Sequence, residues 1–258
     1  MSQRPESSLE LGVIGNCQVS ALVDELGRMV WACMPRFDSD PVFCALLMDD
    51  QDAVERGVFE VLLEDFERAE QAYVENTPIL QTWLYDRHGG CVKITDFAPR
   101  YQQFERTFHP YMFVRHLETV TGNPHVTVRL RPAGHYGAED ARQTFGSNHI
   151  RYVLPDLTLR LTTDASLTHV REERPFRLTR PVSFILGPDE SLLESVTRSS
   201  RFHFEQTRAY WREWVRGLAV PFEWQEEVIR AAITLKLCSY EDTGAIIAAM
   251  TSSIPEAP

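Results

Sequence analysis

The sequence contains no apolar run near the roughly 20 residues that a helix needs to cross a bilayer. Its first ten residues, MSQRPESSLE, are polar and lack the apolar centre of a secretion signal. Basic residues are outnumbered, 26 against 37 acidic ones, and the formal net charge is −11. Nucleic acids and anionic membranes attract basic faces, so this balance argues against both as partners. We therefore expect a soluble, cytoplasmic chain with no nucleic-acid and no membrane partner.

Metal and redox motifs are also missing. The five cysteines are scattered without a C-x-x-C motif, and the eight histidines show no spacing typical of metal ligands. Zinc and thiol redox sites usually bring ligands only a few residues apart. We expect reduced cysteines that pack as small hydrophobic residues, no metal site and no cofactor.

Short strand-like segments dominate the first two thirds of the chain. Residues 21–23 and 29–31 flank a glycine-containing loop and predict a β-hairpin. The further candidate strands are residues 58–63, 69–75, 79–85, 92–97, 112–120, 125–131, 150–154, 157–162, 167–170 and 182–186. Apolar and polar residues alternate in several of them, and no long helical pattern interrupts the series. The pattern predicts a disordered lead-in at residues 1–10 and one antiparallel β-sandwich at residues 11–190, with a short helical run at 42–48.

The pattern becomes helical after the sandwich. Residues 199–216 contain neither proline nor glycine and carry Phe202, Tyr210, Trp211 and Trp214 at helical spacings, so we predict a helical linker at residues 191–220. Residues 222–240 form a second candidate helix that is apolar on nearly every face. Such a helix expects partners on several sides. Residues 221–258 therefore resemble the start of a further domain.

Several motifs, in order, carry a family resemblance. They are residues 14–17 (IGNC), 31–39 (WACMPRFDS), 95–100 (TDFAPR), 210–214 (YWREW), 243–249 (TGAIIAA) and 251–258 (TSSIPEAP). Together they resemble the N-terminal part of glycoside hydrolase family 15, the bacterial glucoamylase and trehalase-like group. The resemblance extends from about residue 11 to the end of the chain.

The resemblance implies a mainly β fold, a large antiparallel super-sandwich followed by a linker helix and the first helix of an incomplete (α/α)6 barrel. Family members hydrolyse terminal α-glucosidic bonds with inversion, using two barrel glutamates. Such carboxyl groups stand roughly 6.5–9.5 Å apart so that a water molecule fits between them. The family places both glutamates beyond the last motif present here. The resemblance therefore implies a chain without catalytic residues of its own that supports and partly lines a catalytic barrel, and that is inactive alone.

The candidate site residues are those that the resemblance places towards the barrel or its sugar. They are Arg36, Phe37, Asp38, Thr251, Ser252 and Glu256. Arg36 and Asp38 could instead pair with each other and cap the next helix. Implied partners are an α-glucoside or trehalose-type sugar in the full-length parent, and a barrel in the same chain or in a separate one. The exposed C-terminal helix could also mediate self-association.

Two further features leave alternatives open. Asn16 stands where the family usually has aspartate, so a charge contact made by that aspartate would be lost. The aromatic residues Trp83, Tyr85, Phe97 and Tyr101 could form a sugar-stacking platform, although rings at strand spacing more often belong to the core. A stand-alone carbohydrate-binding or interaction sandwich therefore remains the alternative function.

Overall fold

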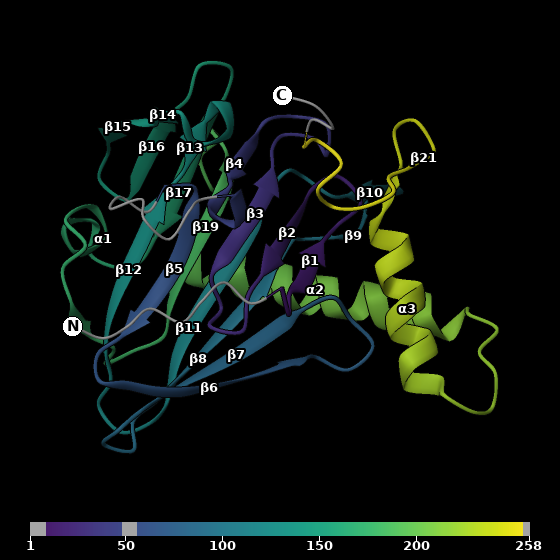
Figure 1. Ribbon diagram of the computed structural model, residues 1–258, viewed down its shortest axis with the longest axis horizontal. Helices are drawn as coiled ribbons and strands as arrows, with labels where there is room; N and C mark the ends of the chain where they lie inside the picture. The colour runs from purple at the N-terminus through teal and green to yellow at the C-terminus, as the bar shows by residue number, and fades with distance from the viewer. Residues whose placement is uncertain (1–8, 48–55, 255–258) are drawn as a thin grey trace.

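The computed structural model describes residues 9–47 and 56–254. Two large antiparallel sheets pack face to face around one main hydrophobic core (Figure 1). Three α-helices occur in the described part of the chain, two of them beyond the last strand of the sandwich. The predicted mainly β sandwich followed by helices is confirmed.

The first sheet, called sheet A, has seven strands. Its order is β1 (Gly12–Gly15), β2 (Ser20–Val23), β3 (Met29–Cys33), β5 (Val58–Leu63), β12 (His125–Arg131) and β18 (Phe176–Arg177), and β4 (Pro41–Phe43) pairs with β3.

The second sheet, sheet B, has eight strands. Its order is β15 (Arg142–Phe145), β16 (His149–Val153), β17 (Thr158–Thr163), β19 (Val182–Pro188), β11 (Phe113–Thr121), β8 (Cys91–Phe97), β7 (Leu80–Asp86) and β6 (Phe66–Tyr73). Three short hairpins pair β9 (Tyr101–Gln103) with β10 (Arg106–Phe108), β13 (Ala133–Gly134) with β14 (Glu139–Asp140), and β20 (Ser239–Tyr240) with β21 (Ala245–Ile246). The 3-10 turns are η1 (Ala45–Leu47) and η2 (His135–Gly137).

The core lies between the two sheets. Strand β12 buries Val126, Val128 and Leu130 and leaves the intervening residues more accessible, as a period of two requires. Across the sheets, the ring of Phe59 meets that of Phe184 edge to face, with centroids 6.1 Å apart. Burial of large side chains on this scale provides the main driving force for the fold.

One ion pair crosses this apolar interior. Arg115 on β11 donates hydrogen bonds to the Asp96 carboxylate at 2.8 and 2.9 Å, and both side chains are buried. The same guanidinium donates to the carbonyl oxygens of Phe59 and Gly27, at 2.7 and 2.6 Å. A buried charge needs such full pairing to be tolerated. Arg115 therefore links sheet B to strand β5 of sheet A, at Phe59, and to the β2–β3 loop, at Gly27.

Most predicted strands agree with the structure, and two segments differ. Residues 125–131 form β12, and the predicted hairpin is β2 paired with β3. Residues 167–170 were expected as a strand but form helix α1 (Leu167–Arg171), because four apolar-rich residues are too few to distinguish the two periods. The helical run expected at 42–48 is wrong for its first residues: β4 pairs Phe43 with Ala32 and buries it in the core. The single turn η1 follows, and Met48 lies outside the described residues.

The aromatic linker helix is α2 (Val196–Arg216), which begins three residues before the stretch 199–216 that indicated it. Its N-cap is Ser195, whose side chain accepts a hydrogen bond from the backbone nitrogen of Arg198. The helix lies across the face of sheet B that points away from the core (Figure 1), where Phe204 packs on Phe97 at 5.9 Å. Residues 196, 200, 203, 207, 211 and 215 form its buried stripe.

The second predicted helix is α3 (Gln225–Leu237), shorter at both ends than the sequence suggested. It buries Ile233 and Leu237 against Trp211 and Val215 of α2 and against Cys17. The chain then returns across the far side of β3, where the indole nitrogen of Trp31 donates to the carbonyl oxygen of Met250 at 2.9 Å. In the described part of the chain, no helix is both long and apolar enough to cross a membrane.

Candidate functional site

The loop after β3 carries three of the residues singled out from the sequence. Arg36 donates two hydrogen bonds of 2.9 Å to the Asp38 carboxylate, and the two side chains are 50% and 71% exposed. This pairing raises the pKa of Arg36, so the guanidinium stays charged. Phe37 turns inward instead and packs edge to face on Tyr240, with ring centroids 6.0 Å apart. The loop therefore exposes the charged Arg36–Asp38 pair at its tip, while Phe37 anchors the loop through its contact with Tyr240.

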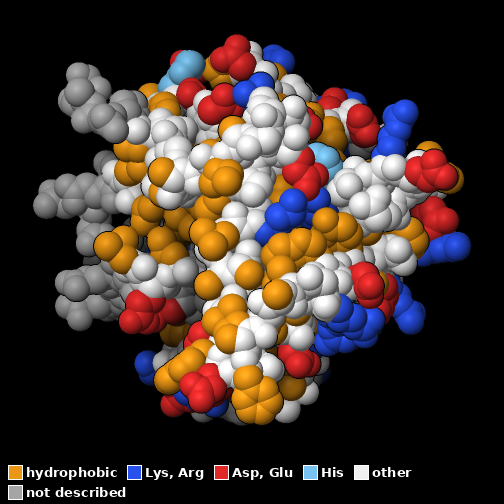
Figure 2. Space-filling view, turned by 90° about the vertical axis from the view of Figure 1, so that its right-hand side faces the viewer, with side chains coloured by type: hydrophobic (Ala, Val, Ile, Leu, Met, Phe, Trp, Pro, Cys, Tyr) orange, Lys and Arg blue, Asp and Glu red, His pale blue; other side chains and the backbone are white. Residues whose placement is uncertain are grey.

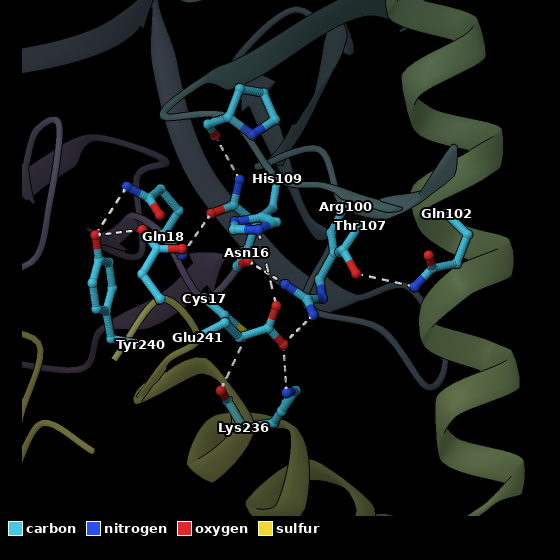
Figure 3. Close-up of polar contacts among 12 residues, drawn as sticks. Asn16, Cys17, Gln18, Arg100, Gln102, Thr107, His109, Lys236, Tyr240 and Glu241 are labelled. Carbon is cyan, nitrogen blue, oxygen red and sulfur yellow. Dashed lines mark hydrogen bonds and ion pairs between the residues drawn. The ribbon is translucent and has the colours of Figure 1, made fainter. Parts of the chain in front are cut away.

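Tyr240 connects this loop to the C-terminal segment. The Arg36 guanidinium lies 5.3 Å from the centre of the Tyr240 ring. The Tyr240 hydroxyl donates to Asp242 at 3.0 Å and accepts a long hydrogen bond of 3.5 Å from Gln18 (Figure 3). Burial and the Asp242 hydrogen bond raise the pKa of Tyr240, so it remains a neutral phenol.

A buried arginine holds the other side of the same region. Arg100 follows β8, and its side chain is only 1% exposed. It donates to the carbonyl oxygen of Asn16 at 2.8 Å and to the Glu241 carboxylate, which also accepts from Lys236 at 2.8 Å (Figure 3). Partial burial would raise the pKa of Glu241, but the hydrogen bonds from Lys236 and Arg100 outweigh it, and the pKa lies below its usual value. Glu241 is thus held as an anion beside two cations.

His109 lies next to this ion pair. Its Nε2 atom is 3.9 Å from the Glu241 carboxylate, and its Nδ1 atom is buried without a hydrogen-bond partner in the described structure. Burial and the neighbouring Arg100 charge lower the pKa of His109. The imidazole is therefore neutral at ordinary pH and adds no third positive charge.

Asn16 is fully buried at the turn between β1 and β2. Its amide nitrogen donates to the carbonyl oxygens of Pro99 and Pro110 at 3.0 and 2.7 Å. Its side-chain oxygen accepts from the backbone nitrogens of Gln18 and Val19, each at 3.1 Å. An aspartate could not make the first two bonds, so the amide suits contacts made within the sandwich.

Thr251 and Ser252 lie in the turn that follows Met250. Ser252 donates from its hydroxyl to the carbonyl oxygen of Ala249 at 2.6 Å. The turn is fixed on the sandwich by Trp31, which binds Met250, and by the side chain of Cys33, 3.1 Å from Ser253. It therefore lies along the strand from which the Arg36 loop continues. Glu256 is outside the described residues, and the roles of all six candidates remain predictions.

The charged side chains named at this face are ion-paired or hydrogen-bonded to one another. Asp38 and Glu241 are each paired with an arginine, and the lowered pKa of Glu241 is the opposite of what a general acid needs. Burial raises the pKa of the Cys17 thiol to about 11, which makes it unsuitable as a nucleophile. Within residues 9–47 and 56–254, no group of three or more His, Cys, Asp or Glu side chains could hold a metal ion.

The four aromatic residues considered as a sugar platform do not form one surface. Phe97 is buried beneath α2, and Tyr101 is buried between the β9–β10 hairpin and the same helix. Trp83 and Tyr85 lie on β7, paired with Lys93 and Cys91 of β8. Sequence reasoning did not single out Tyr240, Arg100 or Glu241 for a role. Tyr240 lies in the predicted helix 222–240 and Arg100 in the motif 95–100, but the contacts of both join residues far apart in the chain.

Comparisons with known proteins agree with this architecture. A family model described as "Trehalase-like, N-terminal" matches residues 5–163. A trehalase of Thermoplasma volcanium is 26% identical over 262 residues, which cover 95% of this chain and 40% of the relative. A trehalase of Mycolicibacterium smegmatis is 26% identical over 275 residues, with 96% and 40% covered. Trehalase 1 of Sulfolobus acidocaldarius is 28% identical over 252 residues, with 96% and 40% covered.

The chain thus spans about two fifths of the length of the curated relatives it matches. The matched family model covers most of the sandwich, including the Arg36 loop and Arg100. The β-sandwich, the family model and the trehalase relatives agree, and the chain belongs to the trehalase-like N-terminal family, the group that the sequence motifs identified within glycoside hydrolase family 15.

Proposed function

We propose that this chain is the non-catalytic N-terminal portion of a glycosidase that hydrolyses the α-glucosidic bond of a trehalose-type sugar with inversion. A catalytic (α/α)6 barrel, in the same chain or in a separate one, supplies the acid and the base. Residues 11–190 form the supporting sandwich, residues 191–220 the linker, and residues 221–258 the start of the barrel domain.

The observation that carries the proposal is the meeting of three segments at one face. The Arg36 loop, the β1–β2 turn and the segment after α3 are joined there through Tyr240 and Gln18. Arg36 and Asp38 are exposed at the tip of this face and offer donors and acceptors in a fixed geometry. A donor–acceptor pair held in place on a rigid scaffold is suited to orienting sugar hydroxyl groups at the rim of a neighbouring site.

Helix α3 provides the surface for the catalytic partner. Its inner side contacts α2 and the sandwich, but Leu235 on the outer side is 68% exposed. Phe222, Trp224 and Ile246 are also exposed in the flanking segments. Figure 2 shows this side of the molecule, with apolar side chains numerous across its middle. An exposed apolar surface of this kind indicates a binding partner, and further barrel helices would cover it.

The carboxylates of this face indicate which part of the enzyme supplies the catalytic acid and base. Inversion needs a protonated acid and a carboxylate base roughly 6.5–9.5 Å apart. Asp38 and Glu241 are ion-paired with Arg36 and Arg100, which opposes their protonation as an acid and weakens them as bases. The proposed barrel supplies both groups, and this chain supplies the fixed rim and the helix contact.

A domain replacement tests this function. The N-terminal part of the Mycolicibacterium smegmatis trehalase that matches this chain is replaced by the chain itself, and initial products are followed by NMR. Inverting hydrolysis of trehalose releases α- and β-glucose in equal amounts, whereas retention releases only the α anomer. Equal amounts are expected.

Two matched variants test whether Arg36 lies at the rim of the sugar site. In the replacement protein, Arg36→Ala is expected to lower kcat/KM for trehalose about tenfold, or roughly 1.4 kcal/mol of transition-state binding. Arg171→Ala removes a similarly exposed, ion-paired arginine from α1 and is expected to leave it unchanged. A folded replacement protein that does not hydrolyse trehalose, or that releases only α-glucose, would contradict the proposal.

A further inference from the structure

The face formed by Arg36, Asp38, Gln18, Tyr240 and Glu241 is named the Arg36 face, and a cavity lies away from it. It has a volume of about 490 Å³ and is bordered by the β9–β10 hairpin, by β17 and β19 of sheet B, by the segment before α2 and by the N-terminal half of α2. This volume lies within the range of roughly 300–1,000 Å³ typical of small-molecule sites. His203 on its wall is eight residues before Trp211, where α3 contacts α2. Along a helix this separation is about 12 Å, so α3 leaves the cavity uncovered.

Stacked aromatic rings form one wall of the cavity. The rings of Tyr101 and Phe108 stack with centroids 4.8 Å apart, and Phe108 stacks on the His203 imidazole at 5.7 Å with nearly parallel planes. Burial lowers the pKa of His203 to about 4, so its ring is neutral at ordinary pH. Phe202 packs edge to face on Tyr101 at 5.6 Å and remains 48% exposed. The wall is therefore rigid, aromatic and uncharged, with one ring accessible.

Polar groups of both signs line the remainder of the cavity. Arg160 is buried, donates to Thr162 at 3.2 Å and lies 3.8 Å from Asp189. Arg198 is paired with Glu194 at 2.6 Å. Gln103, Ser191 and Ser199 add uncharged donors and acceptors to the lining.

The balance of these charges restricts the chemical class of ligand that the cavity can bind. A phosphate or carboxylate ligand would need an excess of unpaired positive charge, but each arginine of the lining has a carboxylate beside it. A lipid would need a continuous apolar lining, which the arginine, serine and glutamine side chains interrupt. The remaining fit is a neutral molecule with one apolar face and many hydroxyl groups.

We propose that this cavity binds a neutral carbohydrate of one or two pyranose rings. Phe202 contacts the C–H face of one ring, and the polar lining, including Arg160 and Ser199, faces the hydroxyl groups. The site shares none of its residues with the Arg36 face, so it goes beyond the proposed function and does not depend on it. It gives the sandwich a sugar-binding activity of its own.

The test is binding of trehalose, maltose and glucose to the purified 258-residue chain, measured by calorimetry and by ligand-observed NMR. At least one of these sugars is expected to bind with a dissociation constant in the millimolar range. Phe202→Ala is expected to weaken binding at least about fivefold through loss of ring contact. Phe145→Ala is the matched control, because Phe145, on β15 of sheet B, is 49% exposed, close to the 48% of Phe202, and does not line the cavity.

A second variant guards against a folding effect. Ser199→Phe adds a ring at the cavity wall without removing a core contact, and it is expected to abolish binding while the melting temperature stays unchanged. Arg36→Ala is expected to leave this binding unchanged, which separates the cavity from the Arg36 face. Absence of binding by all three sugars, or binding that survives both Phe202→Ala and Ser199→Phe, would overturn the inference. Binding lost only with Arg36→Ala would also overturn it, while leaving the proposed function intact.

Discussion

Glu241→Gln tests how the C-terminal helix is held on the sandwich. Glutamine keeps the size of the side chain but removes the charge that neutralises Arg100 and Lys236. Arg100 keeps its bond to the carbonyl oxygen of Asn16 and its contact with the Tyr210 ring, 4.9 Å away. The variant therefore leaves a buried guanidinium without its carboxylate but with its other contacts.

The cost follows from burial. Removal of one partner from a buried ion pair costs about 3–5 kcal/mol of unfolding free energy. Glu241 is 29% exposed, so water replaces part of the lost interaction, and we expect about 2–3 kcal/mol. In a chain of this size, 1 kcal/mol corresponds to about 2–4 °C, so the melting temperature should fall by about 4–12 °C.

The pH dependence adds an independent check. The folded pKa of Glu241 is depressed, so its contribution to stability is present above the unfolded value, 4.5, and is lost as the pH falls through the folded pKa. The difference between the native chain and the variant should therefore shrink below pH 4.5.

Thermal unfolding at several pH values, combined with amide exchange across α3, measures these effects. Glu213→Gln is the control, because Glu213 forms an exposed pair with Arg216 and its loss should change little. Equal melting temperatures and equal exchange of α3 in the native chain and Glu241→Gln would refute the assigned role of Arg100.

Three further changes test other parts of the structure. Asn16→Asp removes two hydrogen-bond donors from buried carbonyl oxygens, so urea unfolding should show a loss of about 2–4 kcal/mol, and unchanged stability would contradict the contacts described. The pKa of His203 is lowered from 6.5 to about 4, so stability should fall as the pH drops through this window, by up to about 3 kcal/mol. In His203→Gln this loss should be smaller, as equilibrium unfolding would show. Leu235→Glu places a charge on the outer side of α3 and should reduce any concentration-dependent association in sedimentation experiments; persistent association would locate the contact elsewhere.

Local periodicity accounts for much of the fold. Strand β12 was predicted to the residue because its alternation is regular, and the aromatic spacing of α2 reveals a helix. Segment 167–170 was misassigned because four residues carry too little periodic signal. Strand β4 forms because pairing with β3 buries Phe43 in the core, and this tertiary contact outweighs the local helical pattern.

The site was only partly accessible from the sequence. The Arg36 loop was found through motifs, and the mutual pairing of Arg36 and Asp38 was one of the alternatives considered. The Arg100–Glu241 pair joins residues 141 positions apart, and no local pattern signals it. The aromatic cavity was hidden for the same reason, because Tyr101 and Phe108 belong to the β9–β10 hairpin whereas Phe202 lies far along the chain on α2.

Assay of the purified chain for trehalose hydrolysis, without a catalytic partner, tests whether its role is non-catalytic. Asp38 and Glu241 at the Arg36 face are paired with arginines, Asp242 accepts a hydrogen bond from Tyr240, and the proposed acid and base belong to the barrel. We expect no release of glucose above the uncatalysed rate. Turnover that persists through purification and disappears in Asp38→Asn would contradict this expectation, because a carboxylate of this chain would then take part in the reaction.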